Sequence, residues 1–396
     1  MHLYMALLLM LLDCTFSYKI LVFSPRLGHS HVNFMGKIAD ILVEAGHDVV
    51  YDRLMESLQM EQYDLGITEH INFCGYAIFR RIGLDSYITA MAINLLEVSS
   101  DFFGVNSNPS YVPAVKESSL VLVNNDELLE YPRLISRKIV FIGGIAVPEA
   151  SPLIEQLMDR SECGAILVSF GTVVKSEDMN HDTKKAFEDI TFIWKYENEE
   201  EEGDVHSSNI IKRKWIPQND LLNHRNLLGF VSHCGQNSLM ESISAGVPLI
   251  CMPLFGDQFR NAGTAKNRNV AVVLNKENLT ATSLASALRT IIYEESYRKN
   301  AQILQKMTRQ KPISARERLI RNIEFVVKYG PFDNFNVVGS DLNIFQYFLV
   351  DVLSVIVPLV LIAIYISASL TLHLFFSFYS ISKIFIRRFF FFLVKN

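Results

Sequence analysis

The stretch from residue 215 to residue 258 constrains the fold of this chain more than any other, and it reads WIPQNDLLNHRNLLGFVSHCGQNSLMESISAGVPLICMPLFGDQ. Its apolar run at residues 227–232 is short, as in a strand buried within a parallel sheet. A helix is expected from about residue 236, and a second apolar run follows at residues 248–252. A strand, a helix and another strand in this order predict an open α/β sheet.

Polar residues follow both of these predicted strands. The helix start near residue 236 directs unpaired backbone N–H groups and the positive end of the helix dipole beyond the first strand, an arrangement that suits a phosphate. Asp257 and Gln258 come just after the second strand. In open α/β sheets the ligand crevice lies at such strand ends, so the sequence predicts an anion-binding site here.

The spacing of these residues resembles the donor-binding signature of the UDP-glycosyltransferases, in particular the membrane-bound UDP-glucuronosyltransferase branch. The matching pattern is WxPQ, then HxGxNS, a Glu three residues after Ser238, and GxPxxxxPxxxDQ. The resemblance extends from the first strand near Tyr18 to the apolar C-terminus. It implies an α/β protein with two Rossmann-like domains of GT-B type and one C-terminal transmembrane helix. We expect an acceptor-binding domain at residues 18–147 and a UDP-sugar-binding domain at residues 153–330.

The resemblance also implies a role for each residue of the signature. Trp215 would stack on uracil and Gln218 would meet its edge, because an aromatic ring and an amide offer those contacts. Glu241, one helical turn into the helix, would accept hydrogen bonds from the ribose hydroxyls. Any one of these residues alone is more often structural, but the ordered set favours donor binding. The remaining donor residues are assigned to the diphosphate (His233, Gly235, Asn237, Ser238, with Gly171 and Thr172 at the strand end of SFGT) and to the transferred sugar (Asp257, Gln258).

A histidine-bearing turn follows the first predicted strand, residues 20–23, and precedes a predicted helix at residues 32–45. Imidazole has a pKa near 6.5 and suits proton transfer at neutral pH. In the family the histidine of this turn is the general base, and the pattern GxSHxNFMG assigns that role to His31. His29 in the same turn is the less favoured alternative.

A histidine base needs a carboxylate that orients it and stabilises the imidazolium. The register of the resemblance places Glu69 there, just past the next strand, where many relatives have Asp. The competing interpretation of Glu69 is an ordinary exposed carboxylate. Asp64 is expected at the entry to the same strand.

The predicted reaction is inverting transfer of glucuronic acid from UDP-glucuronate to a hydroxyl of a small lipophilic acceptor, with no cofactor and no metal. Two internal segments of the first half are short compared with the family, one before Asp64 and one after Ala114. A catalytically silent shortened isoform that binds nucleotide sugar or pairs with full-length relatives is therefore an alternative. A UDP-glucosyltransferase is another, because no cationic partner for a glucuronate carboxylate is evident. Homo- or hetero-oligomers are compatible with either.

Both ends of the chain are apolar, which agrees with the hydrophobic content of 49% and the mean hydropathy of +0.20. Residues 1–17 resemble a signal peptide, although a cationic start is missing; a buried first helix is the alternative. Residues 350–373, with an uncharged apolar centre at 352–372, are long enough to span a membrane. Positive residues in the tail, 374–396, predict a cytosolic tail and a lumenal body, hence a single-pass type I protein. The resemblance implies that its membrane is that of the endoplasmic reticulum. The sequon at Asn278 is then a possible glycosylation site.

The charge and cysteine patterns exclude other classes. A net charge of −5 and the lack of a basic patch argue against nucleic-acid binding. The five cysteines have no CxxC spacing, so they predict no metal site, and their scatter implies no disulfide framework. The acidic run at residues 197–204 is interpreted as a solvated loop.

Overall fold

The computed structural model describes residues 17–24, 29–50, 58, 61–71, 74–93, 117–132, 135–148, 158, 161, 163–170, 190–196, 203–204, 209–336 and 343–394. Contacts divide the chain into a globular unit, Met1–Asn336, and a second unit, Val337–Asn396. The predicted signal peptide before residue 17, Gly171, Thr172 and most of the acidic run lie outside the described residues. The side chain of Asn278 also lies outside them.

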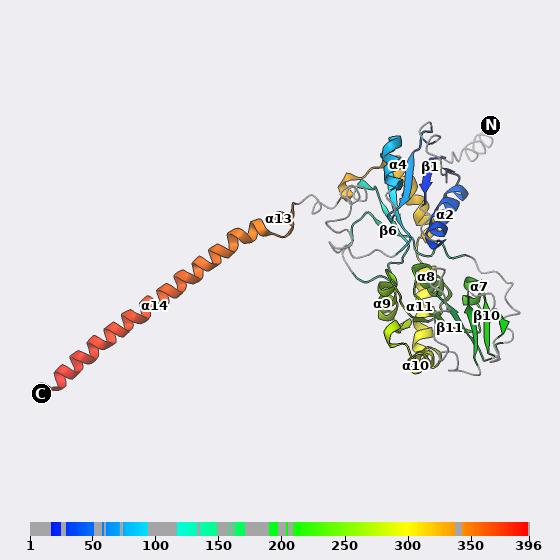
Figure 1. The fold of residues 1–396 in the computed structure, drawn as a ribbon. Helices are drawn as coiled ribbons and strands as arrows, with labels where there is room; N and C mark the ends of the chain where they lie inside the picture. The colour runs from blue at the N-terminus through cyan, green and yellow to red at the C-terminus, as the bar shows by residue number, and fades with distance from the viewer. Residues whose placement is uncertain are drawn as a thin grey trace, which may run out of the picture. The chain divides into compact units, whose positions relative to one another are not determined.

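A first sheet of six parallel strands occupies the N-terminal half of the globular unit (Figure 1). Its strand order is β2-β1-β3-β4-β5-β6. The strands are β1 (Lys19–Phe23), β2 (Asp48–Val50), β3 (Leu65–Glu69), β4 (Tyr87–Met91), β5 (Val121–Val123) and β6 (Ile139–Phe141). The order steps outward in both directions from β1, as in a doubly wound sheet, so a crevice is expected at the carboxyl ends of β1 and β3.

Helices cover both faces of this sheet, because side chains alternate between the faces along each strand. Ile20 and Val22 of β1 pack in a buried cluster with α2 (His29–Glu44), whereas Leu21 packs in another with α4 (Cys74–Ile82). Phe79 of α4 lies so close to β3 that a side chain at Gly66 would approach its ring to 2.7 Å. The first half is therefore a three-layer sandwich in which helices pack on both faces of the sheet.

The helix α2 begins at His29, three residues before the predicted start, and ends at Glu44. Gly46, two residues after this end, closes the helix. Gly46 has a φ of 92°, its N–H donates to the carbonyl of Val43, and the N–H of His47 donates to that of Leu42. This left-handed closing turn favours glycine.

A second sheet of seven strands forms the other half, in the order β13-β12-β11-β7-β8-β10-β9. All neighbours are parallel except β9 and β10. The strands are β7 (Ala165–Ser169), β8 (Thr191–Lys195), β9 (Gly203–Asp204), β10 (Ile210–Arg213), β11 (Leu227–Ser232), β12 (Leu249–Cys251) and β13 (Ala271–Val273). The predicted strand at residues 227–232 has the predicted bounds, and its neighbour is shorter than residues 248–252.

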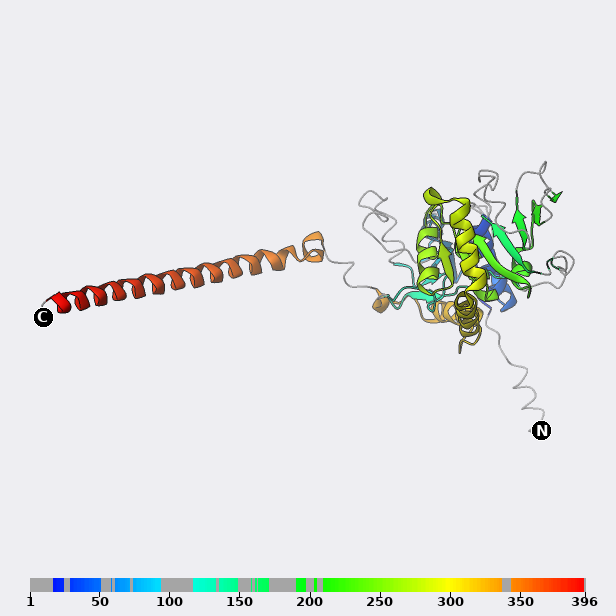
Figure 2. The same cartoon turned by 90° about the horizontal axis from the view of Figure 1, so that it is seen from below.

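Helices also cover both faces of the second sheet, and in Figure 2 the yellow-green to yellow helices stand beside its green strands. One buried cluster contains residues of α7 (Gln218–Leu222), α8 (Gln236–Ala245), α9 (Gln258–Asn267) and α11 (Glu295–Arg309). Another cluster contains Leu284, Leu288 and Ile291 of α10 (Ala281–Tyr293). A short 3-10 helix, Lys276–Asn278, precedes α10.

The last helix of the globular unit returns to the first half. α12 (Ala315–Tyr329) places Leu319, Ile323 and Val326 in the same buried cluster as β1 and α2. The 3-10 helix Asp333–Phe335 follows, and Phe335 packs at the edge of this cluster. This segment therefore crosses back to the N-terminal half.

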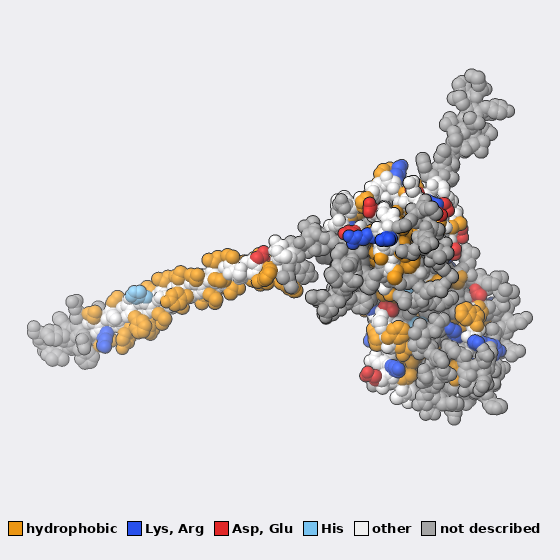
Figure 3. Space-filling model, turned by 45° about the horizontal axis from the view of Figure 1, so that its top comes forward, with side chains coloured by type: hydrophobic (Ala, Val, Ile, Leu, Met, Phe, Trp, Pro, Cys, Tyr) orange, Lys and Arg blue, Asp and Glu red, His pale blue; other side chains and the backbone are white. Residues whose placement is uncertain are grey.

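The second unit consists of α13 (Ile344–Tyr347) and α14 (Val350–Val394). Residues Val350–Ile384 of α14 have a mean hydropathy of 2.5 and are long and apolar enough to cross a membrane. Hydrophobic side chains cover most of the face of this helix seen in Figure 3. The helix continues beyond the predicted end at residue 373, because the Phe-rich tail is also helical.

Candidate active site

His31 and Glu69 of the first half meet at the carboxyl ends of β1 and β3. These strands are neighbours, with Phe23 opposite Thr68. Nδ1 of His31, in the first turn of α2, forms a short hydrogen bond with Oε1 of Glu69, the last residue of β3. The Glu69 side chain is fully buried, whereas 18% of the His31 side chain is exposed. A buried carboxylate thus orients an imidazole that remains accessible.

The electrostatics of this pair follow from burial and charge. Burial lowers the pKa of His31, but the hydrogen bond to Glu69 and the charges of Glu69 and Asp257 outweigh it, so the pKa is raised above its usual value. A hydrogen bond and a negative charge both favour the protonated imidazole. This is the arrangement that stabilises an imidazolium after proton uptake.

The two alternatives considered from the sequence have different positions. Asp64 precedes β3, and its Oδ2 accepts a hydrogen bond of 2.7 Å from the backbone N–H of Lys19 at the amino end of β1. It therefore lies at the opposite end of the strands from His31. The side chain of His29 is outside the described residues.

Asp257 extends the site into the second half. Its charge interacts with that of His31, so the two groups approach each other from different sheets. Burial raises the pKa of Asp257, opposed by a hydrogen bond of 2.8 Å from Asn261 and by the charge of His31. Gln258 is buried, and its Oε1 accepts from the N–H groups of Leu254 and Phe255 at 2.8 and 3.2 Å. Its amide oxygen thus supports this loop, which leaves the amide N–H groups as its donors for a ligand.

The start of α8 has the features of an anion site. Gly235 is the N-cap residue, and no side chain caps the helix. A Cβ atom at Gly235 would lie 2.4 Å from Nε2 of His233, so only glycine fits beside this ring. Burial lowers the pKa of His233 to about 4, helped by the charge of Lys195 and opposed by a hydrogen bond to the backbone of Ser169. The ring is therefore neutral at pH 7, with one nitrogen that donates and one that accepts.

Cys234 forms a disulfide that the spacing of the cysteines did not predict. It has a φ of 61°, a conformation that favours glycine, and it forms a disulfide with Cys251. The scatter of the cysteines along the sequence did not predict this bond. It arises because β11 and β12 are parallel neighbours with Ser232 opposite Cys251, which brings Cys234 near the end of β12.

The residues assigned to the nucleoside lie together beside α8. Trp215 is 69% exposed rather than part of the core, and Nζ of Lys195 lies 5.5 Å from its ring centroid. Nε2 of Gln218 donates to Oε2 of Glu241 at 2.5 Å and to Oγ of Ser238 at 3.3 Å. Burial raises the pKa of Glu241, opposed by the bond from Gln218. Gln218, predicted to meet the uracil edge, is therefore already linked to Glu241, predicted to bind ribose.

Two asparagines of the first half, which the sequence did not single out, contact the start of α8. Nδ2 of Asn124 donates to Oδ1 of Asn237 at 2.8 Å, and Nε2 of Gln236 donates to Oδ1 of Asn125 at 3.2 Å. Both asparagines directly follow β5. Their position at a strand end could have identified them, since this is where such sheets place ligands. Among the described residues, no group of three or more His, Cys, Asp and Glu could hold a metal ion.

Comparison with known proteins gives the chain a family. Residues 85–384 match the model of the family described as UDP-glucoronosyl and UDP-glucosyl transferase. This match begins after Glu69, so the His31–Glu69 pair rests on geometry.

Curated relatives have two kinds of name. UDP-glucosyltransferase 2 of Dactylopius coccus is 33% identical over 65% of this chain and 51% of its own length. UDP-glucuronosyltransferase 3A1 of Xenopus laevis is 30% identical over 78% of this chain and 62% of its own length. UDP-glucuronosyltransferase 1-2 of Mus musculus is 32% identical over 65% of this chain and 49% of its own length. The chain thus spans about half to three fifths of the length of these relatives.

Solved structures share the fold. The spinosyn forosaminyltransferase SpnP superposes with a TM-score of 0.65 at 16% identity, covering 79% of this chain and all of that one. The structure of LpCGTa in complex with UDP gives 0.61 at 12% identity over 80% of this chain. These glycosyltransferases have the GT-B fold, which confirms the two Rossmann-like halves predicted from the sequence. With a family model that matches most of its length, the chain belongs to the UDP-glucoronosyl and UDP-glucosyl transferase family.

Proposed function

We propose that the protein transfers a hexosyl group from a UDP-sugar to a hydroxyl of a small lipophilic acceptor, with inversion at the anomeric carbon. The observation that carries this proposal is the His31–Glu69 pair at the end of the first sheet, within electrostatic reach of Asp257 in the second. A base and a sugar-binding carboxylate from the two halves then meet at one place, where an acceptor and a donor can be held in line.

In the proposed reaction, neutral His31 removes the proton of the acceptor hydroxyl while the oxygen attacks the anomeric carbon. Glu69 stabilises the resulting imidazolium through its buried hydrogen bond. The bond to the UDP oxygen breaks on the opposite face. The uncapped amides at the start of α8 stabilise the negative charge that develops on the diphosphate.

For the donor sugar we propose glucuronic acid, which is supported by the names of the vertebrate relatives. Glucose is the second candidate, and Arg260 favours it. This arginine of α9 is the nearest cation in sequence to Asp257, but its guanidinium lies 2.6 Å from Glu130 and over the ring of Tyr131. A glucuronate carboxylate would have to compete with Glu130 for this cation, whereas neutral glucose needs no such partner.

We also propose that α14 anchors the protein in the endoplasmic reticulum membrane with the globular unit in the lumen. The span starts near Asp351, and cationic residues follow its apolar part at Lys383, Arg387 and Arg388. Cationic residues remain preferentially on the cytosolic side, which supports a lumenal body. A protease-protection assay on microsomes tests this orientation: cleavage of the globular unit in intact microsomes would refute it.

The activity is tested by UDP release from membranes that carry the full chain, supplied with UDP-glucuronate or UDP-glucose and a panel of phenols and steroids. Acceptor-dependent release that is lost in His31→Ala but kept in His224→Ala, a loop histidine outside the site, is the expected result. The donor that supports release identifies the sugar, and a retained anomeric configuration in the product would refute inversion. UDP binding without release would show that the chain is a silent nucleotide-sugar-binding form instead.

A further inference from the structure

A cavity of about 660 Å³ lies in the globular unit, apart from the candidate active site. Among the described residues, its walls come from α2, the segment after β6, α8, the end of α11 and the start of α12. None of the residues assigned to the donor or to proton transfer lines it. A volume of this size is typical of small-molecule sites.

The charge of this cavity is opposite to that of the chain. Its walls contain five cationic side chains, and three carboxylates lie on the walls or beside them, whereas the whole chain has a net charge of −5. The cations are Lys37, Arg309, Lys311, Arg316 and Arg318, and the carboxylates are Glu44, Asp126 and Glu127. Among the described residues, two of these positive charges therefore have no matching carboxylate, which is the charge that a phosphate monoester dianion would neutralise.

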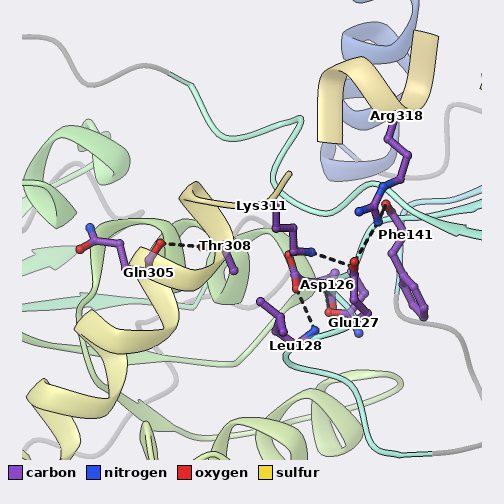
Figure 4. Close-up of polar contacts among 10 residues, drawn as sticks. Asp126, Glu127, Leu128, Phe141, Gln305, Thr308, Lys311 and Arg318 are labelled. Carbon is purple, nitrogen blue, oxygen red and sulfur yellow. Dashed lines mark hydrogen bonds and ion pairs between the residues drawn. The ribbon is translucent and has the colours of Figure 1, made fainter. Parts of the chain in front are cut away.

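Two of these cations, Lys311 and Arg318, form ion pairs with carboxylates (Figure 4). Nζ of Lys311 lies 2.7 Å from Oδ2 of Asp126 and 2.7 Å from Oε2 of Glu127. A guanidinium nitrogen of Arg318 lies 3.0 Å from Oε1 of Glu127 and donates to the carbonyl of Phe141 at 3.1 Å. These contacts join the linker between α11 and α12, and the start of α12, to the turn that follows β5.

The cations that remain available are on α2 and α11. Arg309 donates to the neutral carbonyl of Ser244 at 2.8 Å and forms no ion pair with a described residue. Lys37 has no hydrogen bond or ion pair with any described residue and faces the cavity from α2. Arg316 lies 2.6 Å from Glu44 through one of its nitrogens, which leaves its other N–H groups as donors.

The rest of the wall is apolar and includes Ile41, Phe141, Ile145, Val147 and Met240. A bare phosphate would leave this surface in contact with water, whereas a phosphate attached to an apolar body would cover it. The cavity therefore combines a cationic region with a hydrophobic one, and its volume exceeds that of a single phosphate.

We propose that this cavity binds a phosphorylated small molecule with an apolar body, held by Lys37 and Arg309. Such a ligand would contact α2, whose first turn carries His31, and α8, whose first turn carries Asn237. It would thus bridge the two halves of the globular unit from a place outside the active site.

The test is calorimetric titration of the full chain in detergent with phenyl phosphate, in the presence of saturating UDP so that the candidate donor site is occupied. Binding should weaken about tenfold in Lys37→Met and in Arg309→Met, which is about 1.4 kcal/mol each. Lys37→Arg should retain binding within about threefold, because it keeps the charge. The matched control is Lys306→Met, an exposed lysine of α11 that does not line the cavity. Inorganic phosphate should bind about tenfold more weakly than phenyl phosphate, because it lacks the apolar contact.

Absence of binding by the unmodified chain would overturn the proposal, as would equal binding by Lys37→Met, Arg309→Met and the Lys306→Met control. The thermal midpoint of each variant, measured beside the titration, separates a lost ligand contact from a damaged fold. If UDP does not bind, the titration is repeated without it, and the same variants still decide, because none of them belongs to the proposed donor site. Failure of the proposed transferase activity and failure of this site are therefore distinguishable.

Discussion

The two halves of the globular unit organise their candidate site residues differently. In the second half, the described donor candidates lie between Trp215 and Gln258 and surround one strand and the helix that follows it. Several are already bonded to one another, as Gln218 is to Glu241 and Ser238. In the first half, His31 and Glu69 come from separate strand ends and meet only because β1 and β3 are neighbours. The comparison indicates that the proposed donor site is built from one stretch of sequence, whereas the proposed proton-transfer pair depends on topology.

The largest effect should come from the first half. His31→Ala removes the proposed base, and general-base catalysis contributes about 10²–10⁴-fold, so kcat should fall by that factor. Binding of UDP, measured by calorimetry, should not change, because His31 contacts none of the donor residues around α8. An equal loss of UDP affinity would show that the two halves do not divide the work in this way.

Glu69→Gln should lower kcat about 100-fold and also move the pH profile. The neutral imidazole is the active base, so kcat/KM rises with pH through the pKa of His31. Glu69 raises that pKa, and the amide removes the charge responsible, so the rising limb should shift to lower pH. The pH profile of Asp64→Asn, a carboxylate at the other end of the strand, should match that of the unmodified chain. If the rising limb of the pH profile stays at the same pH in Glu69→Gln, then Glu69 does not set the pKa of His31.

In the second half, Trp215→Ala should weaken UDP binding about tenfold, because an exposed ring that stacks on a base contributes about 1–3 kcal/mol. Residual turnover at saturating donor should remain close to that of the unmodified chain. Calorimetry with UDP and with uridine measures the effect. A similar affinity for both ligands before and after the change would mean that the ring does not stack on the nucleoside.

The smallest effect should come from the contact between the halves. Asn124→Ala removes the hydrogen bond to Asn237 and should weaken UDP binding about threefold to tenfold, because a neutral hydrogen bond contributes about 0.5–1.5 kcal/mol. Asn322→Ala, a half-buried asparagine of α12 that donates to the carbonyl of Arg318, serves as the control. If Asn124→Ala alters kcat and leaves UDP affinity intact, the bond positions the acceptor side instead.

The sequence predicted most of the architecture where the hydrophobic pattern was strong. The strand at residues 227–232 and the start of α8 at Gln236 agree with the prediction, because an apolar run followed by Gly235 leaves few alternatives. The strand β12 was predicted one residue too long at each end, since the apolar Pro248 and Met252 continue beyond the paired backbone.

Other features depend on contacts between distant segments, which a single sequence does not reveal. The Cys234–Cys251 disulfide requires the register of β11 and β12. The link between Asn124 and Asn237 requires the packing of one half on the other. The predicted pairing of Glu69 with His31 came from the family pattern, and its geometry is now visible, although its role in catalysis remains a prediction to be tested.

The crossing of α12 has a consequence for the order in which the chain folds during synthesis. Domains generally fold as they leave the ribosome, the N-terminal one first. Here the core of the first half includes Leu319, Ile323 and Val326, so it stays incomplete until the second half has been made. The surface of α2 and β1 that these side chains cover would be exposed throughout that interval. The half that is synthesised first is therefore the half whose hydrophobic core is completed last.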